Sequence, residues 1–206
     1  DKNATIRLSI DPRGMQAMVF RTDKKNEFIE PYSDNPNVYV VYESQRAKGQ
    51  LPFTCSTDDV NLTTEISNRT NSLARSSSGE LLIFRLALSS TSEYAAYFGA
   101  TSASQWNLVL AAYNATMTRV NGVFEKDFAI HMNIISQSQN VAYYNAATDP
   151  YSAAATGSGG AWNTELQNTL TSVIGNANYD VGHLFGASGG GGNAGCIGCV
   201  CVSPPV

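Results

Sequence analysis

Residues 81–88 read LLIFRLAL, a nearly continuous apolar run interrupted by Arg85. A short run of this kind is typical of a strand whose sheet is covered on both faces. It is too short to cross a membrane as a helix, which takes about 18 apolar residues or more. We therefore expect residues 81–88 to form a central strand, with the following segments building a sheet around it.

Helices and strands alternate after this run. The first helix is predicted from apolar residues at three- and four-residue spacing, namely Trp106, Val109, Leu110, Tyr113, Met117, Val120 and Phe124. Ser102 and Gln105 have the spacing of a capping box at its start. The next segment alternates like a strand, with apolar residues at Phe128, Ile130, Met132 and Ile134. A second helix, followed by Gly175 near its C-cap, is predicted from Trp162, Leu166, Leu170, Val173 and Ile174.

Two further strands are expected, at residues 179–185 and 196–202. Strands that alternate with helices are joined by right-handed crossovers and form a mostly parallel sheet. Residues 80–206 are therefore predicted to form an α/β (α+β) domain, with a mixed, mostly parallel, twisted sheet and two main helices.

The N-terminal residues have a different pattern. Ile6, Leu8 and Ile10 alternate with polar residues, a turn sequence follows at 11–14, and further β-like runs occupy 17–20 and 38–42. Residues 1–55 are thus predicted to be a small β-meander. Residues 56–79 are polar and lack apolar periodicity, which indicates a linker, and Arg75 within it is a candidate processing site for a protease.

Composition narrows the class of protein. The 206 residues carry a formal net charge of −4 and no cluster of Lys and Arg, so nothing favours binding to a nucleic-acid backbone. Charged residues make up only 15% of the chain, and such a weakly charged polar surface favours a secreted or extracellular setting. No apolar run is long enough for a membrane span.

Residues 186–201 read GASGGGGNAGCIGCVC and invite several interpretations. A phosphate-binding loop is disfavoured because these glycines lead into a β-like segment and no Lys-Ser/Thr pair follows them. A zinc site built on Cys196, Cys199 and Cys201 would need a fourth ligand, for which Cys55, His131 and His183 are the choices. Disulfides, including one to Cys55, and free thiols are equally compatible with the spacing.

No complete active site is visible in the sequence. The motifs H-E-x-x-H, G-x-S-x-G and H-x-x-E-H are all absent. His131 and His183 are the only histidines, and both fall within predicted strands, where a histidine is more often a hydrogen-bonded structural residue than a ligand.

Several segments together resemble a known family. They are residues 82–88 followed by TSEY at 91–94, VNGVFEKDF at 120–128, AATDPY at 146–151, YDVGHLF at 179–185 and GCIGCVC at 195–201. This set resembles the start of the catalytic domain of secreted bacterial reprolysin-like zinc metallopeptidases, which belong to the metzincin clan. The resemblance covers roughly residues 80 to 202.

The resemblance implies a zinc-dependent endopeptidase that hydrolyses extended protein substrates. In that family the next element is the helix with H-E-x-x-H-x-x-G-x-x-H, whose histidines bind zinc. This chain is expected to end before that helix. We therefore expect it to lack a zinc site of its own and to be inactive alone. The missing C-terminal part of the domain is then a partner, beside the peptide substrate. The implied substrate-binding edge strand comprises Gly195, Cys196, Ile197, Gly198, Cys199, Val200 and Cys201.

The same resemblance gives the N-terminal residues a role. Residues 1–55 are similar to the β-rich end of an inhibitory propeptide, and Cys55 is similar in placement to a cysteine-switch residue that ligates the catalytic zinc. The alternative is a non-catalytic extracellular binding or structural domain, either a degenerate metzincin or an unrelated α/β module.

Overall fold

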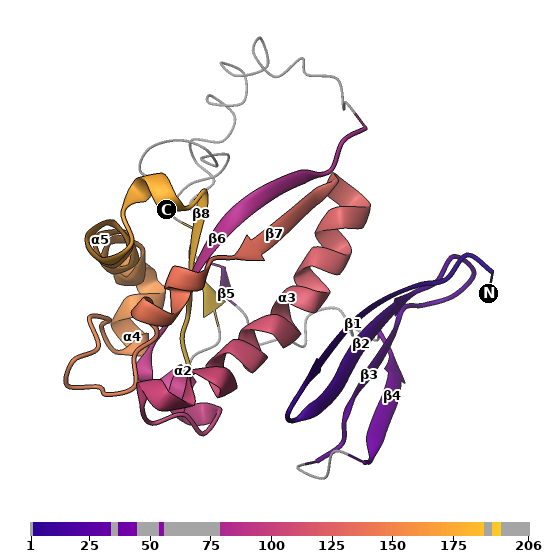
Figure 1. Cartoon of the computed structure of the whole chain (residues 1–206), viewed down its shortest axis with the longest axis horizontal. Helices are drawn as coiled ribbons and strands as arrows, with labels where there is room; N and C mark the ends of the chain where they lie inside the picture. Colours follow the sequence, from indigo (N-terminus) through magenta and orange to yellow (C-terminus); the bar gives the residue numbers. More distant parts are fainter. Residues whose placement is uncertain (1, 34–36, 45–53, 56–78, 188–190, 195–206) are drawn as a thin grey trace.

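A three-stranded parallel sheet lies at the centre of the molecule (Figure 1). The computed structural model describes residues 2–33, 37–44, 54–55, 79–187 and 191–194. Strand β6 (Leu82–Ser90) pairs in parallel with β7 (Ile130–Ile134) on one side and with β8 (Val181–Phe185) on the other. The predicted parallel pairing is confirmed for these three strands.

Alternate side chains of β6 face two different helices, because successive side chains of a strand point to opposite faces of the sheet. Leu86 and Leu88 pack with α3 (Trp106–Phe128), whereas Ala87 packs with α5 (Trp162–Val173). All three side chains are buried. The sheet is thus a middle layer between two helical layers, as an α/β domain requires.

The apolar run that begins β6 is buried only in its second half. Leu81, Leu82 and Ile83 are 51%, 52% and 61% exposed. The expectation of a strand covered on both faces is therefore wrong for these residues. The reason lies in the register, because β7 pairs with residues 82–86 of β6 and β8 pairs with residues 86–90. Within the described part of the chain, the start of β6 consequently has a neighbouring strand on one side only.

Helix α3 differs from its prediction at both ends. It is 23 residues long and ends where Ala129 adopts a left-handed φ of 54°, so Phe128 belongs to the helix and not to the following strand. The predicted capping box is also wrong in detail. Ser102 makes no capping bond through its side chain, and the Gln105 side-chain oxygen instead accepts a hydrogen bond from the Thr101 backbone N–H (2.8 Å).

Shorter helical segments connect these elements. They are α2 (Ser92–Tyr97), η1 (Ala103–Gln105), η2 (Ser136–Val141), α4 (Ala154–Thr156), η3 (Gly157–Ala161) and η4 (Asn176–Asn178). Gly175 follows α5 at a φ of 85°, which confirms the predicted end of that helix. None of the helices in the described ranges is long and apolar enough to span a membrane.

The N-terminal residues build a second, antiparallel sheet (Figure 1). Its strands are β1 (Thr5–Asp11), β2 (Gly14–Phe20), β3 (Glu27–Pro31) and β4 (Tyr39–Glu43), in that spatial order. We call it the N-terminal sheet. Gly14 adopts a φ of 120° in the β1–β2 hairpin, where a Cβ atom would lie only 2.9 Å from the Pro31 ring. The predicted meander is confirmed, and β3 is an addition to it.

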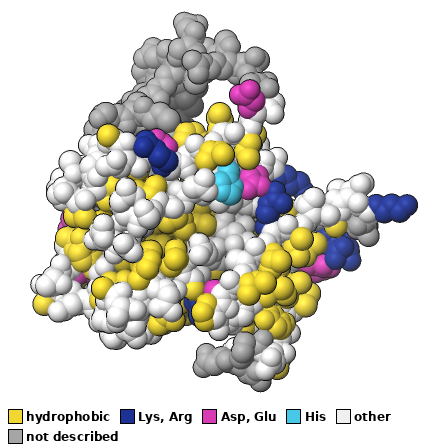
Figure 2. Space-filling view, viewed as in Figure 1, with side chains coloured by type: hydrophobic (Ala, Val, Ile, Leu, Met, Phe, Trp, Pro, Cys, Tyr) yellow, Lys and Arg dark blue, Asp and Glu magenta, His cyan; other side chains and the backbone are white. Residues whose placement is uncertain are grey.

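One face of the N-terminal sheet lies on α3. A Cβ atom at Gly122 of α3 would come within 3.0 Å of the Phe20 ring, so the helix and β2 approach closely there. Apolar side chains gather over the N-terminal sheet in the space-filling view (Figure 2). Large exposed apolar residues of this sheet include Ile6, Leu8, Ile10 and Val41, at 50%, 48%, 76% and 62% exposure.

Two very short strands form a third pairing. Strand β5 (Thr54–Cys55) runs parallel to β9 (Gly191–Gly192). The pair joins a segment that follows the N-terminal sheet to the glycine run that follows β8. Segments far apart in the sequence therefore meet at this point.

Candidate functional site

The carboxyl end of the central sheet, where parallel α/β sheets usually bind ligands, is closed by protein side chains. Ser89 near the end of β6 is fully buried. Its Oγ atom lies 2.6 Å from both the Val141 carbonyl oxygen and the Tyr151 hydroxyl. Burial raises the pKa of Tyr151, so this hydroxyl stays neutral and acts as a structural hydrogen-bond partner. The space beside Ser89 is thus filled by protein groups.

A tryptophan fixes the exit from β8 toward the glycine run. Trp162 donates a hydrogen bond from Nε1 to the Ser152 carbonyl oxygen (2.8 Å). A Cβ atom at Gly186 would lie 2.4 Å from the Trp162 ring, and one at Gly157 would lie 2.0 Å from it. A side chain at either position would collide with the indole, and the backbone that leaves β8 at Gly186 therefore passes directly against the ring.

The glycine run carries the β5–β9 pairing, which is the first part of the candidate site. Its end is tied to α5, because the Asn163 amide donates a hydrogen bond to the Asn193 side-chain oxygen. Glycine residues leave space for another backbone to approach closely. The rim formed by β9 can therefore receive an extended segment through main-chain pairing, and β5 is such a segment.

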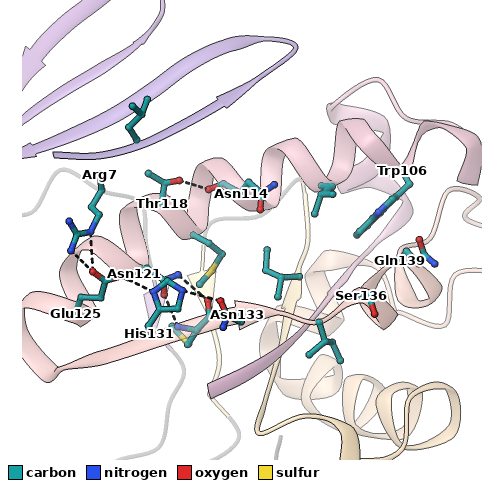
Figure 3. Close-up of a pocket in the computed structure, with 16 residues that line it drawn as sticks. Arg7, Trp106, Asn114, Thr118, Asn121, Glu125, His131, Asn133, Ser136 and Gln139 are labelled. Atoms are coloured by element: carbon teal, nitrogen blue, oxygen red, sulfur yellow. Dashed lines mark hydrogen bonds and ion pairs between the residues drawn. The ribbon is translucent and has the colours of Figure 1, made fainter. Parts of the chain in front are cut away.

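A groove of about 670 Å³ lies between α3 and β7, and its lining residues are drawn in Figure 3. One wall is a stripe of α3 that runs from Trp106 to Glu125, and the other is β7 with the residues that follow it. Arg7 and Leu8 of β1 also line it. The groove is thus shared by the N-terminal sheet and the central domain.

Asn121 closes the outer edge of β7 within this groove. Its amide donates to the Met132 carbonyl oxygen (2.9 Å) and its side-chain oxygen accepts from the Met132 backbone N–H (3.0 Å). The side chain is nearly buried, as the residue is only 9% exposed. An open strand edge invites pairing with other chains, and this amide occupies the position of a neighbouring strand.

Four polar side chains meet at the end of the groove formed by the C-terminal part of α3 (Figure 3). Glu125 accepts hydrogen bonds on one oxygen from Arg7, with Nε at 3.0 Å, and its other oxygen lies 2.7 Å from His131 Nδ1. His131 Nε2 lies 3.0 Å from Asn133 Oδ1. The hydrogen bond to His131 and the contact with Arg7 hold the pKa of Glu125 below its ordinary value. We call these four residues the junction cluster.

The family model described as Metallo-peptidase family M12B Reprolysin-like matches residues 80–205, more than half of the chain. The chain belongs to this family. The match begins just before β6 and leaves out the N-terminal sheet. A search of the curated proteins and a search of the solved structures each gave no match.

Membership in the M12B metallopeptidases implies zinc in the complete enzyme, but the described residues do not offer a site for it. Among them, no group of three or more His, Cys, Asp and Glu side chains is arranged to hold a metal ion. His131 on β7 and His183 on β8 are separated by β6. The ring of His183 packs edge-on against Phe185, with 4.9 Å between the ring centroids. We therefore assign no catalytic step to these two histidines.

Of the site residues predicted from the sequence, some lie outside the described residues. The implied substrate strand, Gly195 to Cys201, and the processing-site candidate Arg75 lie outside the described residues. Cys55 lies within them through its backbone, which pairs with Gly192 of β9. The pairing brings the cysteine-switch candidate to the glycine run, and its role in zinc ligation stays a prediction.

Sequence reasoning missed the junction cluster and Asn121. His131 and Asn133 share a face of β7 because they are two residues apart, and this signal was available. The partnership of Arg7 with Glu125 was not, because the two residues are 118 positions apart and meet only through docking of the N-terminal sheet. Asn121 appeared in the sequence analysis only within the segment 120–128 that carries the family resemblance, with no role of its own.

Proposed function

We propose that this chain joins the inhibitory pro-region of a secreted zinc metalloendopeptidase to the first part of its catalytic domain, which binds extended polypeptide substrates. The family match supports the metallopeptidase part of this proposal. The observation that carries the rest is the pairing of β5 with β9, immediately before the predicted substrate strand that starts at Gly195.

Main-chain pairing explains how such a rim could serve many substrates. An extended peptide that adds to a strand edge is bound through backbone hydrogen bonds with little regard to its sequence. β5 uses this same mode of binding against β9. A substrate that approached the rim would therefore compete with β5, and the pro-region would keep the cleft occupied until it is removed.

Two attachments of unequal size support an inhibitory pro-region. The larger is the N-terminal sheet on α3, where Arg7 pairs with Glu125 and Glu30 pairs with Arg119. The smaller is the two-residue strand β5. A two-residue pairing is weak by itself, but a tethered segment acts at a high effective concentration, about millimolar for short flexible linkers. The sheet would act as the anchor and β5 as the segment that blocks the rim.

The two remaining predicted residues fit this scheme as follows. The Cys55 thiolate would hold the zymogen inactive by ligating the zinc of the complete enzyme, since zinc in this position otherwise activates water for hydrolysis. Cleavage after Arg75 would separate the pro-region from the domain that starts near residue 80. The chain has no H-E-x-x-H motif, so we expect no hydrolysis by it alone.

Binding of labelled, denatured casein to the full chain tests the blocked rim. Thr54→Pro combined with Cys55→Pro removes the N–H groups of β5 and prevents its pairing. We expect this double variant to bind casein at least about tenfold more tightly than the parent, because the tethered competitor is lost. The matched control is Thr54→Ser combined with Cys55→Ser, which keeps the backbone donors and should bind casein like the parent.

Equal casein affinity in both double variants would contradict a blocking role of β5. Chelator-sensitive cleavage of casein by the chain alone, with zinc added, would contradict the expected inactivity. The alternative, a non-catalytic binding domain, predicts casein binding without any peptidase activity even when the chain is extended by the codons that follow Val206. An H-E-x-x-H motif encoded there would favour the peptidase.

A further inference from the structure

The junction cluster contains a histidine that shares a carboxylate with a residue of the N-terminal sheet. Glu125 of α3 uses one oxygen for Arg7 of β1 and the other for His131 of β7, as Figure 3 shows. In the space-filling view, basic, acidic and histidine side chains lie side by side where the N-terminal sheet meets the central domain (Figure 2). The contact that holds the sheet on α3 is therefore directly coupled to an imidazole.

Among the described residues, few other charges surround His131. Arg7 and Glu125 are the other ionisable side chains among the residues that line the groove. On β6, the residue in register with His131 is the apolar Ile83, while Arg85 is engaged with Asp180. Helix α3 carries three other charged residues: Arg119 pairs with Glu30, Lys126 lies over the Phe20 ring, and Asp127 is exposed.

The imidazole can change its charge without moving. Nδ1 faces a carboxylate oxygen and Nε2 faces the Asn133 side chain, whose amide can present either its oxygen or its nitrogen. With the amide oxygen facing Nε2, both ring nitrogens donate and the ring is an imidazolium. With the amide nitrogen facing it, Nε2 accepts and the ring is neutral. Both charge states are compatible with the observed positions.

We propose that His131 makes docking of the N-terminal sheet on α3 sensitive to pH, so that docking is tight when the imidazole is neutral and weakens when it is protonated. With a neutral ring, Arg7 and Glu125 form a balanced pair. With an imidazolium, two cations share one carboxylate and repel each other. The proposal rests on the proposed function only in treating the N-terminal sheet as a pro-region that must be released.

Linkage fixes the direction of the effect. Undocking removes the Arg7 cation from beside the ring and so relieves its repulsion of an imidazolium. By reciprocity, a proton on His131 favours the undocked state. Docking therefore weakens as pH falls through the range, about pH 5 to 8, in which histidines change charge. The lowered pKa of Glu125 keeps its carboxylate ionised over this range.

Amide NMR of the full chain measures this equilibrium. The Gly122 amide reports docking, because a Cβ atom at Gly122 would lie within 3.0 Å of Phe20 and 3.1 Å of Arg7. An Arg7→Ala variant supplies the reference for the undocked state. We expect the docking constant to fall about five- to tenfold between about pH 7.5 and about pH 5.5, the size of a typical coupling between two sites.

Two substitutions of histidine identify the group responsible. His131→Gln, which cannot gain a proton, should abolish the pH response, whereas His183→Gln removes the other histidine of the chain, on β8, and should leave it unchanged. Glu125→Gln should weaken docking at both pH values, because it removes the shared charge. An unchanged docking constant in the parent, or an unchanged response in His131→Gln, would overturn the proposal.

The outcome is independent of the test for β5. If docking does not respond to pH while the Thr54→Pro/Cys55→Pro variant still opens the rim, the role of His131 is wrong and the proposed pro-region stands. If docking responds to pH but the rim variants bind casein alike, the pH-sensitive junction is correct and the blocking role of β5 is wrong.

Discussion

The two main sheets of this molecule are held together in different ways. The central sheet, β7-β6-β8, is covered by helices, and Leu86, Ala87 and Leu88 at its middle are at most 3% exposed. The N-terminal sheet has one face on α3 and leaves large apolar side chains open, with Ile10 at 76% exposure. Burial of apolar area between two helical layers stabilises the first sheet, whereas the second combines the buried apolar residues Ala17, Met18 and Phe20 of β2 with charged and cation–π contacts to helices.

This difference indicates that the two parts behave differently when they separate. A domain that buries its own core can keep its structure after its partner leaves. Docking of a four-stranded sheet that is held partly by ion pairs and cation–π contacts weakens when those contacts are lost, and each is worth about 1 kcal/mol at an exposed site. The contacts concerned are Arg7–Glu125, Arg119–Glu30, Arg119–Phe28, Lys126–Phe20 and Arg13–Phe98.

The largest predicted effect is loss of a core side chain in the central sheet. Leu88 is fully buried on β6, in the cluster that includes Val109 and Tyr113 of α3. Leu88→Ala should lower the free energy of unfolding by about 2 to 5 kcal/mol, because it removes apolar contacts and leaves a cavity. Ile10→Ala in the N-terminal sheet should change it by less than about 0.5 kcal/mol. Urea unfolding of both variants measures the two losses in unfolding free energy. Similar losses would contradict the difference between the two sheets.

Asn121 gives the next largest effect, since it satisfies two backbone groups at the edge of β7. Asn121→Ala leaves the Met132 N–H and carbonyl groups without this partner in a nearly buried place. We expect a loss of about 2 to 4 kcal/mol in unfolding free energy. Asn114→Ala, at an exposed position of the same helix, is the control and should cost less than about 0.5 kcal/mol. Equal losses would mean that the edge of β7 gains little from Asn121.

The sequence predicted much of the central sheet because its signals are local. Apolar spacing located α3 and α5, and alternation located β7 around Met132. The exposed start of β6 could not be foreseen, because its exposure depends on the stagger between β7 and β8 and not on the composition of residues 81–83. The end of α3 was missed because Phe128 continues the alternation of the next strand, while the helix is ended by the backbone of Ala129.

The candidate site was less accessible to sequence reasoning. Cys55 was singled out by its similarity in placement to a cysteine-switch residue, but its pairing opposite Gly192 joins residues more than a hundred positions apart. Arg7 and Glu125 gave no signal at all, since each alone is an ordinary charged residue on a strand or helix surface. Such contacts are decided by tertiary docking, and no local pattern in the chain encodes them.

A substitution at Gly122 should separate the two sheets without unfolding either. A larger side chain there collides with Phe20 and Arg7, whereas leucine favours the helix over glycine by up to about 1 kcal/mol. Gly122→Leu should therefore weaken docking by about 1 to 2 kcal/mol, the usual cost of overpacking. Amide NMR should show β1 and β2 tumbling separately while β6 signals are unchanged. Gly159→Leu, whose Cβ would have nothing within 4 Å, is the control and should leave docking intact.

The smallest predicted effect concerns a charged contact of the central sheet itself. Asp180 accepts hydrogen bonds from the Arg85 backbone N–H (2.7 Å) and from its guanidinium, which hold the pKa of Asp180 below its ordinary value. Its contribution to stability is present above the unfolded-state pKa, about 3.9, and is lost as pH falls through the lower folded-state value. Asp180→Asn should thus flatten the loss of unfolding free energy below about pH 4, as measured by urea unfolding at several pH values.

Because Arg85 is half exposed, the change in unfolding free energy caused by Asp180→Asn should be smaller than that caused by Asn121→Ala. A larger change would mean that charge pairing stabilises the central sheet as much as its core does, and the distinction between the two sheets would fail.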